Sequence, residues 1–147
     1  MKRIILSIAC LIFLNACGAT ADSKTLLGVD SNNDGVRDDI EVYIKQKYPQ
    51  QDQQNAVMQM ARYYQSVMSL DSDSYKDVQT ISREGDRSFT CVFKTFKGGS
   101  DANGKSIADE IVKLTMNTRK RRKAYKRYDH ALDGSVFTIP RENYCDN

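Results

Sequence analysis

Apolar residues recur at helical spacing over most of the chain from residue 38 onward. The clearest pattern repeats at i, i+3, i+4 and i+7, and it predicts a helix with one broad apolar stripe formed by Val57, Met60, Ala61, Tyr64, Val67 and Met68. A shorter helix is expected before it, from Asp38 to Tyr48, because Pro49 cannot continue a helix.

Two later segments show the same period. The first runs from about Ser74 to Phe96, and we predict a helix there although residues 88–96 also have a composition typical of a strand. Gly98–Ser100 and Asn103–Gly104 then indicate a loop. A last helix is expected from about Ser106 to Leu132, with an apolar side formed by Ile107, Ile111, Leu114, Thr118, Tyr125, Tyr128 and Leu132.

These segments predict an all-α protein with about four helices in one domain over residues 38–147. His130 is the only histidine, which excludes multi-histidine zinc sites. Nucleophile-elbow, phosphate-loop and dinucleotide motifs are also missing from the sequence. We therefore expect a non-enzymatic protein. Only a structure could reveal the converging carboxylates of a hydrolase, so that alternative stays open.

The helix expected over residues 106–132 has a basic side opposite its apolar one. Within an arc of roughly 120° lie Arg119, Lys120, Lys123, Lys126 and Arg127, while Arg121 and Arg122 flank or enter the apolar side. This face is either simply solvated or binds an anionic membrane lipid, an anionic envelope polymer or an acidic protein partner.

Oxygen-bearing side chains alternate in the twelve residues from Asp30 to Glu41, just ahead of the first helix. Oxygen ligands are what a calcium ion requires, and six to eight of them must converge on one point. Gly35 stands at position 6, where the backbone must turn sharply. The segment resembles EF-hand loops and the related Asp-x-Asx-x-Asp-Gly loops of bacterial and thrombospondin type-3 proteins. The resemblance covers only these residues and implies a calcium site formed by Asp30, Asn32, Asp34, the Val36 carbonyl, Asp38 and Glu41.

The resemblance has two departures. Arg37 stands at position 8, where paired loops carry an aliphatic residue, and residues 21–29 leave no room for a full entering helix. We therefore expect a single loop followed by one helix. The alternative is a polar turn in which Asp38 is the N-cap of that helix and Glu41 completes a capping box, although this leaves the spacing of Asp30, Asn32 and Asp34 unexplained.

The N-terminus has the pattern of a targeting segment. Lys2 and Arg3 precede an apolar run over residues 4–14, which is too short to span a membrane. The following Leu-Asn-Ala-Cys-Gly sequence, residues 14–18, resembles the lipobox of bacterial lipoproteins. This resemblance implies removal of residues 1–16, a lipid on Cys17, a tether over residues 17–29 and an outer-membrane location in the bacterial envelope. The alternative is an ordinary secretory signal with an incidental cysteine.

This processing changes both the charge and the cysteine count. Two of the 22 Lys and Arg residues would be removed, leaving 20 against 19 Asp and Glu, so the net charge falls from +3 to about +1 and argues against nucleic acid as a partner. Cys91 and Cys145 would be the remaining cysteines, and an oxidising envelope predicts a disulfide between them. The alternative is that Cys91 is a nucleophile assisted by His130.

Overall fold

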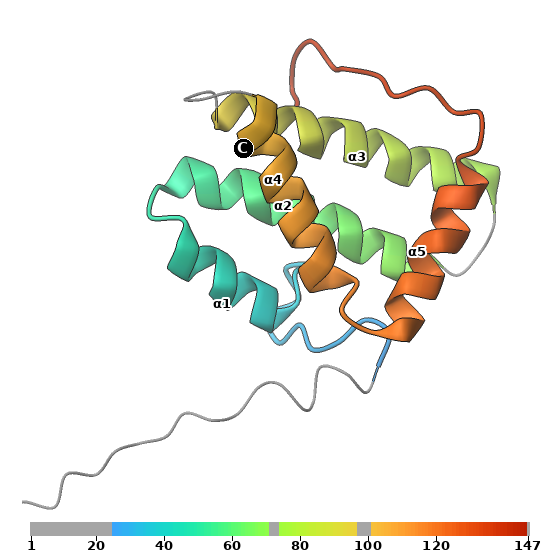
Figure 1. Ribbon diagram of the computed structural model, residues 1–147, viewed down its shortest axis with the longest axis horizontal. Helices are drawn as coiled ribbons and strands as arrows, with labels where there is room; N and C mark the ends of the chain where they lie inside the picture. Colours follow the sequence, from blue (N-terminus) through green and yellow to red (C-terminus); the bar gives the residue numbers. More distant parts are fainter. Residues whose placement is uncertain (1–24, 71–73, 97–100, 147) are drawn as a thin grey trace, which may run out of the picture.

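The computed structural model describes residues 25–70, 74–96 and 101–146. Five helices lie in these ranges, and no strand occurs in them: α1 (Asp38–Lys47), α2 (Gln51–Ser69), α3 (Tyr75–Thr95), α4 (Asp101–Thr115) and α5 (Arg119–Ala131) (Figure 1). The predicted all-α class is confirmed, with five helices in place of about four.

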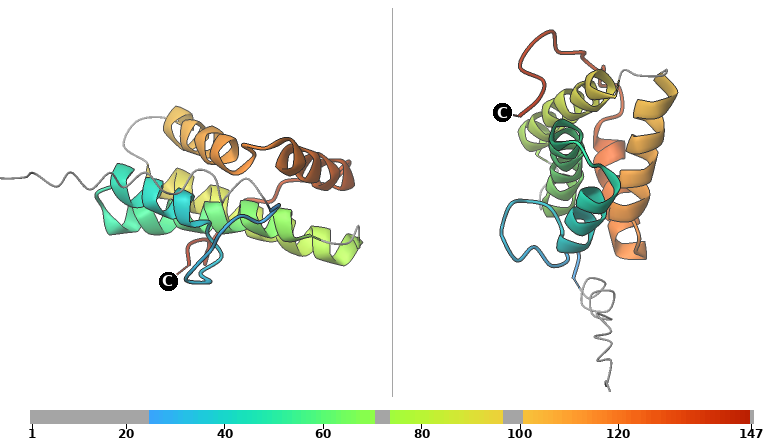
Figure 2. Two further views of the ribbon diagram at one scale, coloured as in Figure 1. Left: turned by 90° about the horizontal axis from the view of Figure 1, so that it is seen from below. Right: turned by 90° about the vertical axis from the view of Figure 1, so that its left-hand side faces the viewer.

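Helices α2 and α3 lie side by side and form the centre of the protein. Helix α2 contacts all four other helices, and α4 and α5 form a second layer over the α2 and α3 pair (Figures 1 and 2). Residues 25–37 lie below the helices in Figure 1, and the segment after α5 returns along α3.

The core forms around the apolar stripe of α2. All six residues predicted for that stripe are buried. Ile40 and Ile44 of α1 pack with them, together with Val92 of α3 and Ile111 of α4. Removing these apolar surfaces from water supplies the main driving force for packing the five helices together.

Helix α3 settles the ambiguity between helix and strand at residues 88–96. It continues without interruption to Thr95, so the helical prediction is confirmed. The loop expected at Asn103–Gly104 is wrong, because both residues belong to α4. A Cβ added at Gly104 would lie 2.8 Å from the Phe93 ring, so glycine permits a close approach of α4 to α3. Gly98–Ser100 lies outside the described residues.

The single helix expected over residues 106–132 is also wrong, because the chain breaks between α4 and α5. Thr118, which the apolar pattern placed on the buried side, is the N-cap of α5, and its side chain accepts a hydrogen bond from the Arg121 backbone at 3.2 Å. A threonine oxygen at this position satisfies one of the free N–H groups that begin a helix. The break therefore has a local cause that apolar periodicity does not report.

The C-terminal segment is attached to the helices by covalent and polar contacts. The predicted disulfide is confirmed: Cys91 of α3 bonds to Cys145, with Cα atoms 4.9 Å apart. Gln59 of α2 donates to the Tyr144 carbonyl at 2.8 Å and accepts from the Asp146 backbone at 3.0 Å. Because Cys91 carries no free thiol, its alternative role as a nucleophile is contradicted.

The disulfide closes a loop of 54 residues in sequence separation. Restricting the unfolded chain by such a loop contributes up to about 4 kcal/mol on the chain-entropy model. We predict that Cys145→Ala lowers the free energy of unfolding, measured by urea denaturation, by up to this amount. The matched variant Cys91→Ala should give a similar loss. An unchanged midpoint in both variants would show that the hydrogen bonds from Gln59 hold the segment by themselves.

Candidate metal centre

The predicted calcium loop lies between residues 25–29 and α1. Residues 25–37 contain no helix, as expected for a loop without an entering helix. The two sides of the loop meet where the Asp38 backbone donates to the Val29 carbonyl at 2.9 Å. Gly35 has φ +82°, a left-handed conformation that glycine adopts at no steric cost, as position 6 of the loop requires.

Side chains at alternating positions bend the backbone of this loop. The Asp30 carboxylate accepts from the Asp34 and Gly35 backbones at 3.2 and 3.0 Å. Asn32 Oδ1 accepts from the Asp34 backbone at 3.1 Å, and Asp34 Oδ1 accepts from the Val36 backbone at 2.8 Å. Each bond turns the chain around the side chain that accepts it. Positions 1, 3 and 5 are thereby held along one tight curve.

Three of the predicted ligands come together, although one lies on a different element. Asn32 Nδ2 is 3.1 Å from Asp34 Oδ2 and 3.4 and 3.5 Å from the two carboxylate oxygens of Glu41 in α1. Lys45, one turn further along α1, donates to Glu41 Oε1 at 2.6 Å, and this hydrogen bond raises the pKa of Lys45. Two nitrogen donors therefore face the Glu41 carboxylate, which points back toward the loop.

Asp38, at position 9, closes the loop from its other side. Its two carboxylate oxygens accept from the Ser31 backbone at 2.8 Å and from the Ser31 hydroxyl at 2.6 Å. The hydroxyl contact and then the backbone contact lower the pKa of Asp38 below its ordinary value of 3.8. The N-cap of α1 is Arg37, whose side chain makes no capping hydrogen bond, and Asp38 is the first helical residue. The capping-box alternative is therefore wrong.

Positions 7 and 8 attach the loop to the protein interior. The Val36 and Arg37 side chains are buried, with 0% and 1% of their surface exposed. The Arg37 guanidinium bonds to the Asp39 carboxylate at 2.7 and 2.8 Å. It also donates to the Leu114 and Thr115 carbonyls at 3.2 and 3.3 Å.

Sequence reasoning treated Arg37 only as a departure from the EF-hand pattern and missed this anchoring role. The available signals were a cation at a position that is ordinarily aliphatic and an acid two residues later.

The donor set defines which cation the loop suits. In the ranges that the structure describes, no three His, Cys, Asp or Glu side chains lie close enough together to hold a metal ion. The predicted set also relies on the Asn32 amide and a backbone carbonyl, which are oxygen donors suited to calcium and not to zinc. Asn32 presents its nitrogen to Asp34 and Glu41, and a half turn of the amide would place its oxygen there.

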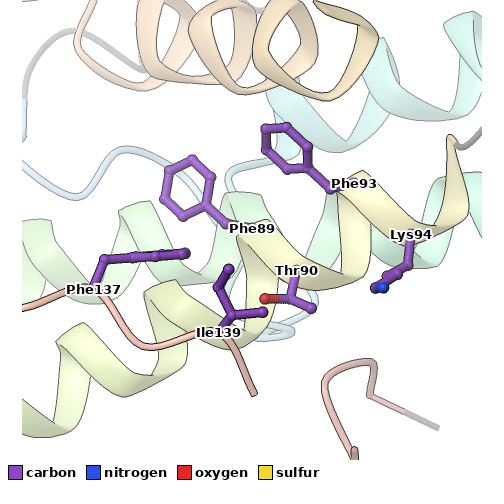
Figure 3. A pocket seen from close by; sticks show the side chains of 6 residues that line it. All are labelled: Phe89, Thr90, Phe93, Lys94, Phe137 and Ile139. Carbon is purple, nitrogen blue, oxygen red and sulfur yellow. The ribbon is translucent and has the colours of Figure 1, made fainter. Parts of the chain in front are cut away.

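Two other surfaces carry possible binding groups. The five cations predicted on the basic side of the last helix are all exposed on α5. An apolar pocket of about 520 Å³ lies between α3 and the C-terminal segment, with aromatic rings from both sides, and Figure 3 shows its lining residues Phe89, Thr90, Phe93, Lys94, Phe137 and Ile139. Sequence reasoning did not anticipate this pocket, because half of its apolar side chains come from a segment without helical periodicity.

His130 is exposed near the end of α5, with Nδ1 2.8 Å from an Asp133 carboxylate oxygen. Cys17 lies outside the described residues. Within the described ranges, none of the helices has the length and apolar character needed to cross a membrane. No family model, curated protein or solved structure matches the chain.

The contact between Ser31 and Asp38 makes loop closure dependent on pH. A carboxyl group whose pKa is lowered by folding stabilises the protein above its unfolded pKa and loses that contribution as pH falls through the folded pKa. We predict that Ser31→Ala raises the pKa of Asp38, measured by NMR titration of its carboxyl carbon. The free energy of unfolding at pH 7 should fall by about 0.5–1.5 kcal/mol, and the difference from wild type should shrink below pH 4.

Ser106→Ala, at an exposed serine of α4, is the matched control and should leave the pKa of Asp38 unchanged. An equal pKa of Asp38 in Ser31→Ala and wild type would contradict the assignment of this contact.

Proposed function

We propose that the protein binds one calcium ion in the loop of residues 30–41 and that this ion has a structural role. The observation that carries the proposal is the convergence of Asn32, Asp34 and Glu41, in which an amide nitrogen lies 3.1–3.5 Å from carboxylate oxygens of both acids. A hydrogen-bond donor surrounded by carboxylate oxygens occupies the kind of environment that a small cation prefers. The left-handed Gly35 and the alternating polar side chains support the same proposal.

The residues would divide the binding between them. Asp30, Asn32, Asp34 and the Val36 carbonyl are the loop ligands, and Glu41 supplies two oxygens from the first turn of α1. Asp38, whose carboxylate is bonded to Ser31, would hold the ion at position 9, where the ligand often acts through water. Lys45 must release Glu41, and its ammonium group reaches water easily because the side chain is exposed. Calcium supplies electrostatic attraction between loop and helix.

The free-energy gain from such a site is modest. Loops of extracellular type bind calcium with dissociation constants of about 0.1–1 mM. At a calcium concentration ten times the dissociation constant, the native state gains about 1.4 kcal/mol. That gain is sufficient to fix the start of α1 and, through Arg37, its position against α4. The proposal therefore assigns calcium to stability and not to catalysis.

The second part of the proposal is a lipid anchor at Cys17 in the outer membrane of a bacterial envelope. Its support is the apolar run of residues 4–14 followed by the lipobox-like sequence ending at Cys17 and Gly18. A free calcium level in the millimolar range and an oxidising environment outside the cytoplasm are consistent with a weak calcium loop and with the disulfide. We propose a lipoprotein on these grounds, and we propose that it is non-enzymatic because its sequence lacks the nucleophile-elbow, phosphate-loop and dinucleotide motifs.

We predict that calcium raises the melting temperature of the chain from residue 18 to residue 147 by roughly 5 °C at ten times its dissociation constant. Calorimetric titration should give one site per chain. Glu41→Gln should weaken binding at least tenfold, because an amide cannot supply two oxygens to the ion. Asp34→Ala should do the same by removing a charged ligand.

Glu142→Gln is the matched control for charge, since Glu142 is an exposed glutamate of the C-terminal segment. It should bind calcium as the wild type does. Absence of both binding heat and thermal shift at millimolar calcium in the wild-type chain would refute the calcium proposal.

The lipid anchor predicts that the chain incorporates labelled palmitate when it is produced in a Gram-negative bacterium. Cys17→Ala should abolish the label because it removes the acceptor thiol. Cys10→Ala changes a cysteine within the segment that is removed and should keep the label. An unlabelled wild-type chain would refute lipidation while leaving the calcium measurements unaffected.

A further inference from the structure

We propose that the exposed basic face of α5 docks on an anionic lipid membrane, and that the N-terminal tether emerges beside the same helix to bring the two together. The proposal rests on the lipid anchor proposed at Cys17. The basic face is defined as Arg119, Lys120, Lys123, Lys126 and Arg127.

The five cations of the basic face are free to meet a partner. Each is exposed, and none forms an ion pair with another described residue. Asp129 is the only acid in α5, and helical geometry places it outside the basic arc. An unpaired group of like charges raises the local potential and attracts a surface of opposite charge.

The buried side of α5 fixes the direction in which the basic face points. Arg121, Ala124 and Tyr128 are buried against the rest of the protein, with Arg121 completely enclosed. Positions 121, 124 and 128 lie roughly opposite the basic arc at 100° per residue. The helix therefore cannot turn its cations toward the interior without exposing its packed side.

Arg121 also joins the start of the described chain to this helix. Its guanidinium donates to the Leu26 carbonyl at 2.9 Å and to the Thr25 carbonyl at 3.3 Å. Gln65 of α2 holds the next carbonyl, that of Leu27, at 2.6 Å. Thr25 to Val29, which the sequence predicted as part of the tether, thus lie against the domain, and Figure 1 shows this segment approaching the lower end of α5.

The remaining tether is short enough to keep α5 near the lipid. Eight residue steps separate Cys17 from Thr25, and at a maximum of about 3.5 Å each they reach roughly 28 Å. Electrostatic attraction to a membrane falls off within a Debye length of about 8–10 Å. A lipid anchor at Cys17 would therefore keep the basic face at a high local concentration near the headgroups.

The charges are numerous enough to matter at such a surface. Each cation close to an anionic leaflet adds to the attraction, so five on one face act together. We favour a membrane over a soluble acidic partner because the lipid anchor proposed at Cys17 would hold every copy of the chain next to a membrane. The docked protein would lie with α5 along the membrane surface. The calcium loop would lie near the same side of the protein, because Arg37 links the loop to the end of α4 that precedes α5.

The test uses the chain from residue 18 to residue 147, which lacks the lipid. The core cluster and the disulfide lie within residues 25–146, so this chain keeps the described packing. Sedimentation with vesicles of phosphatidylcholine containing phosphatidylglycerol should remove the protein from solution, whereas vesicles of phosphatidylcholine alone should not. Sodium chloride should weaken the binding.

The decisive variant reverses three charges of the basic face, at Lys120→Glu, Lys123→Glu and Arg127→Glu. It should bind anionic vesicles at least tenfold more weakly. The matched control, Lys76→Glu, Lys94→Glu and Lys113→Glu, reverses three exposed lysines elsewhere and has the same net charge. It should keep most of the affinity, with circular dichroism showing that both variants are folded.

Several outcomes would overturn the proposal: no binding to anionic vesicles, equal binding to neutral vesicles, or equal losses in the two triple variants. Binding to soluble polyglutamate without binding to vesicles would assign the face to an acidic polymer and would also overturn it. These measurements do not depend on Cys17, so their failure is distinct from failure of the palmitate experiment. Repeating them with EDTA separates them from calcium binding.

Discussion

Two enclosed arginine side chains join the N-terminal segment to the turn between α4 and α5. Arg37 donates to the Leu114 and Thr115 carbonyls at the end of α4, and Arg121 of α5 donates to the Thr25 and Leu26 carbonyls. Burying a guanidinium is costly unless its donors are satisfied, and the last carbonyls of a helix lack partners within the helix. Arg37 satisfies carbonyls at the end of α4, and Arg121 satisfies carbonyls of residues 25 and 26, so the two side chains fix where the loop and this segment lie.

The candidate calcium loop is connected to α4 on one side and to the C-terminal segment on the other. On one side Arg37 ties the loop to α4. On the other, the stem of Arg62 lies beside Gly35, where an added Cβ would be in van der Waals contact with Arg62 Cγ at 3.4 Å. The Arg62 guanidinium then pairs with Asp146 at 3.1 Å, next to the disulfide-bonded Cys145. A change of loop conformation would therefore be felt at α4 and at the C-terminal segment, although the loop itself has few residues in the core.

The spacing and number of residues in the sequence predicted several features of this protein correctly. The α2 stripe, the helical state of residues 88–95, the left-handed Gly35 and the disulfide between Cys91 and Cys145 were all predicted from spacing or counting. The break at Thr118 does not follow from apolar spacing, because its cause is a capping hydrogen bond from the Arg121 backbone. The role of Arg37 does not follow either, because it depends on partners far along the chain: Arg37 contacts carbonyls 77 and 78 residues away. The prediction of a loop at Asn103–Gly104 was wrong for a similar reason. Gly104 lies in α4 and allows this helix to approach the Phe93 ring of α3, a contact that local composition does not predict.

The arginines and lysines of α5 look alike in the sequence but have different surroundings in the structure. Seven of the nine residues from 119 to 127 are Arg or Lys, and charge alone cannot distinguish them. Thr118 caps the helix, and the enclosed Arg121 fixes the rotation of the helix by binding the Leu26 carbonyl. Five of the other cations then face solvent together. Because the residue that orients the helix also binds the Thr25 and Leu26 carbonyls, the position of this segment and the direction of the basic face are determined by the same contacts.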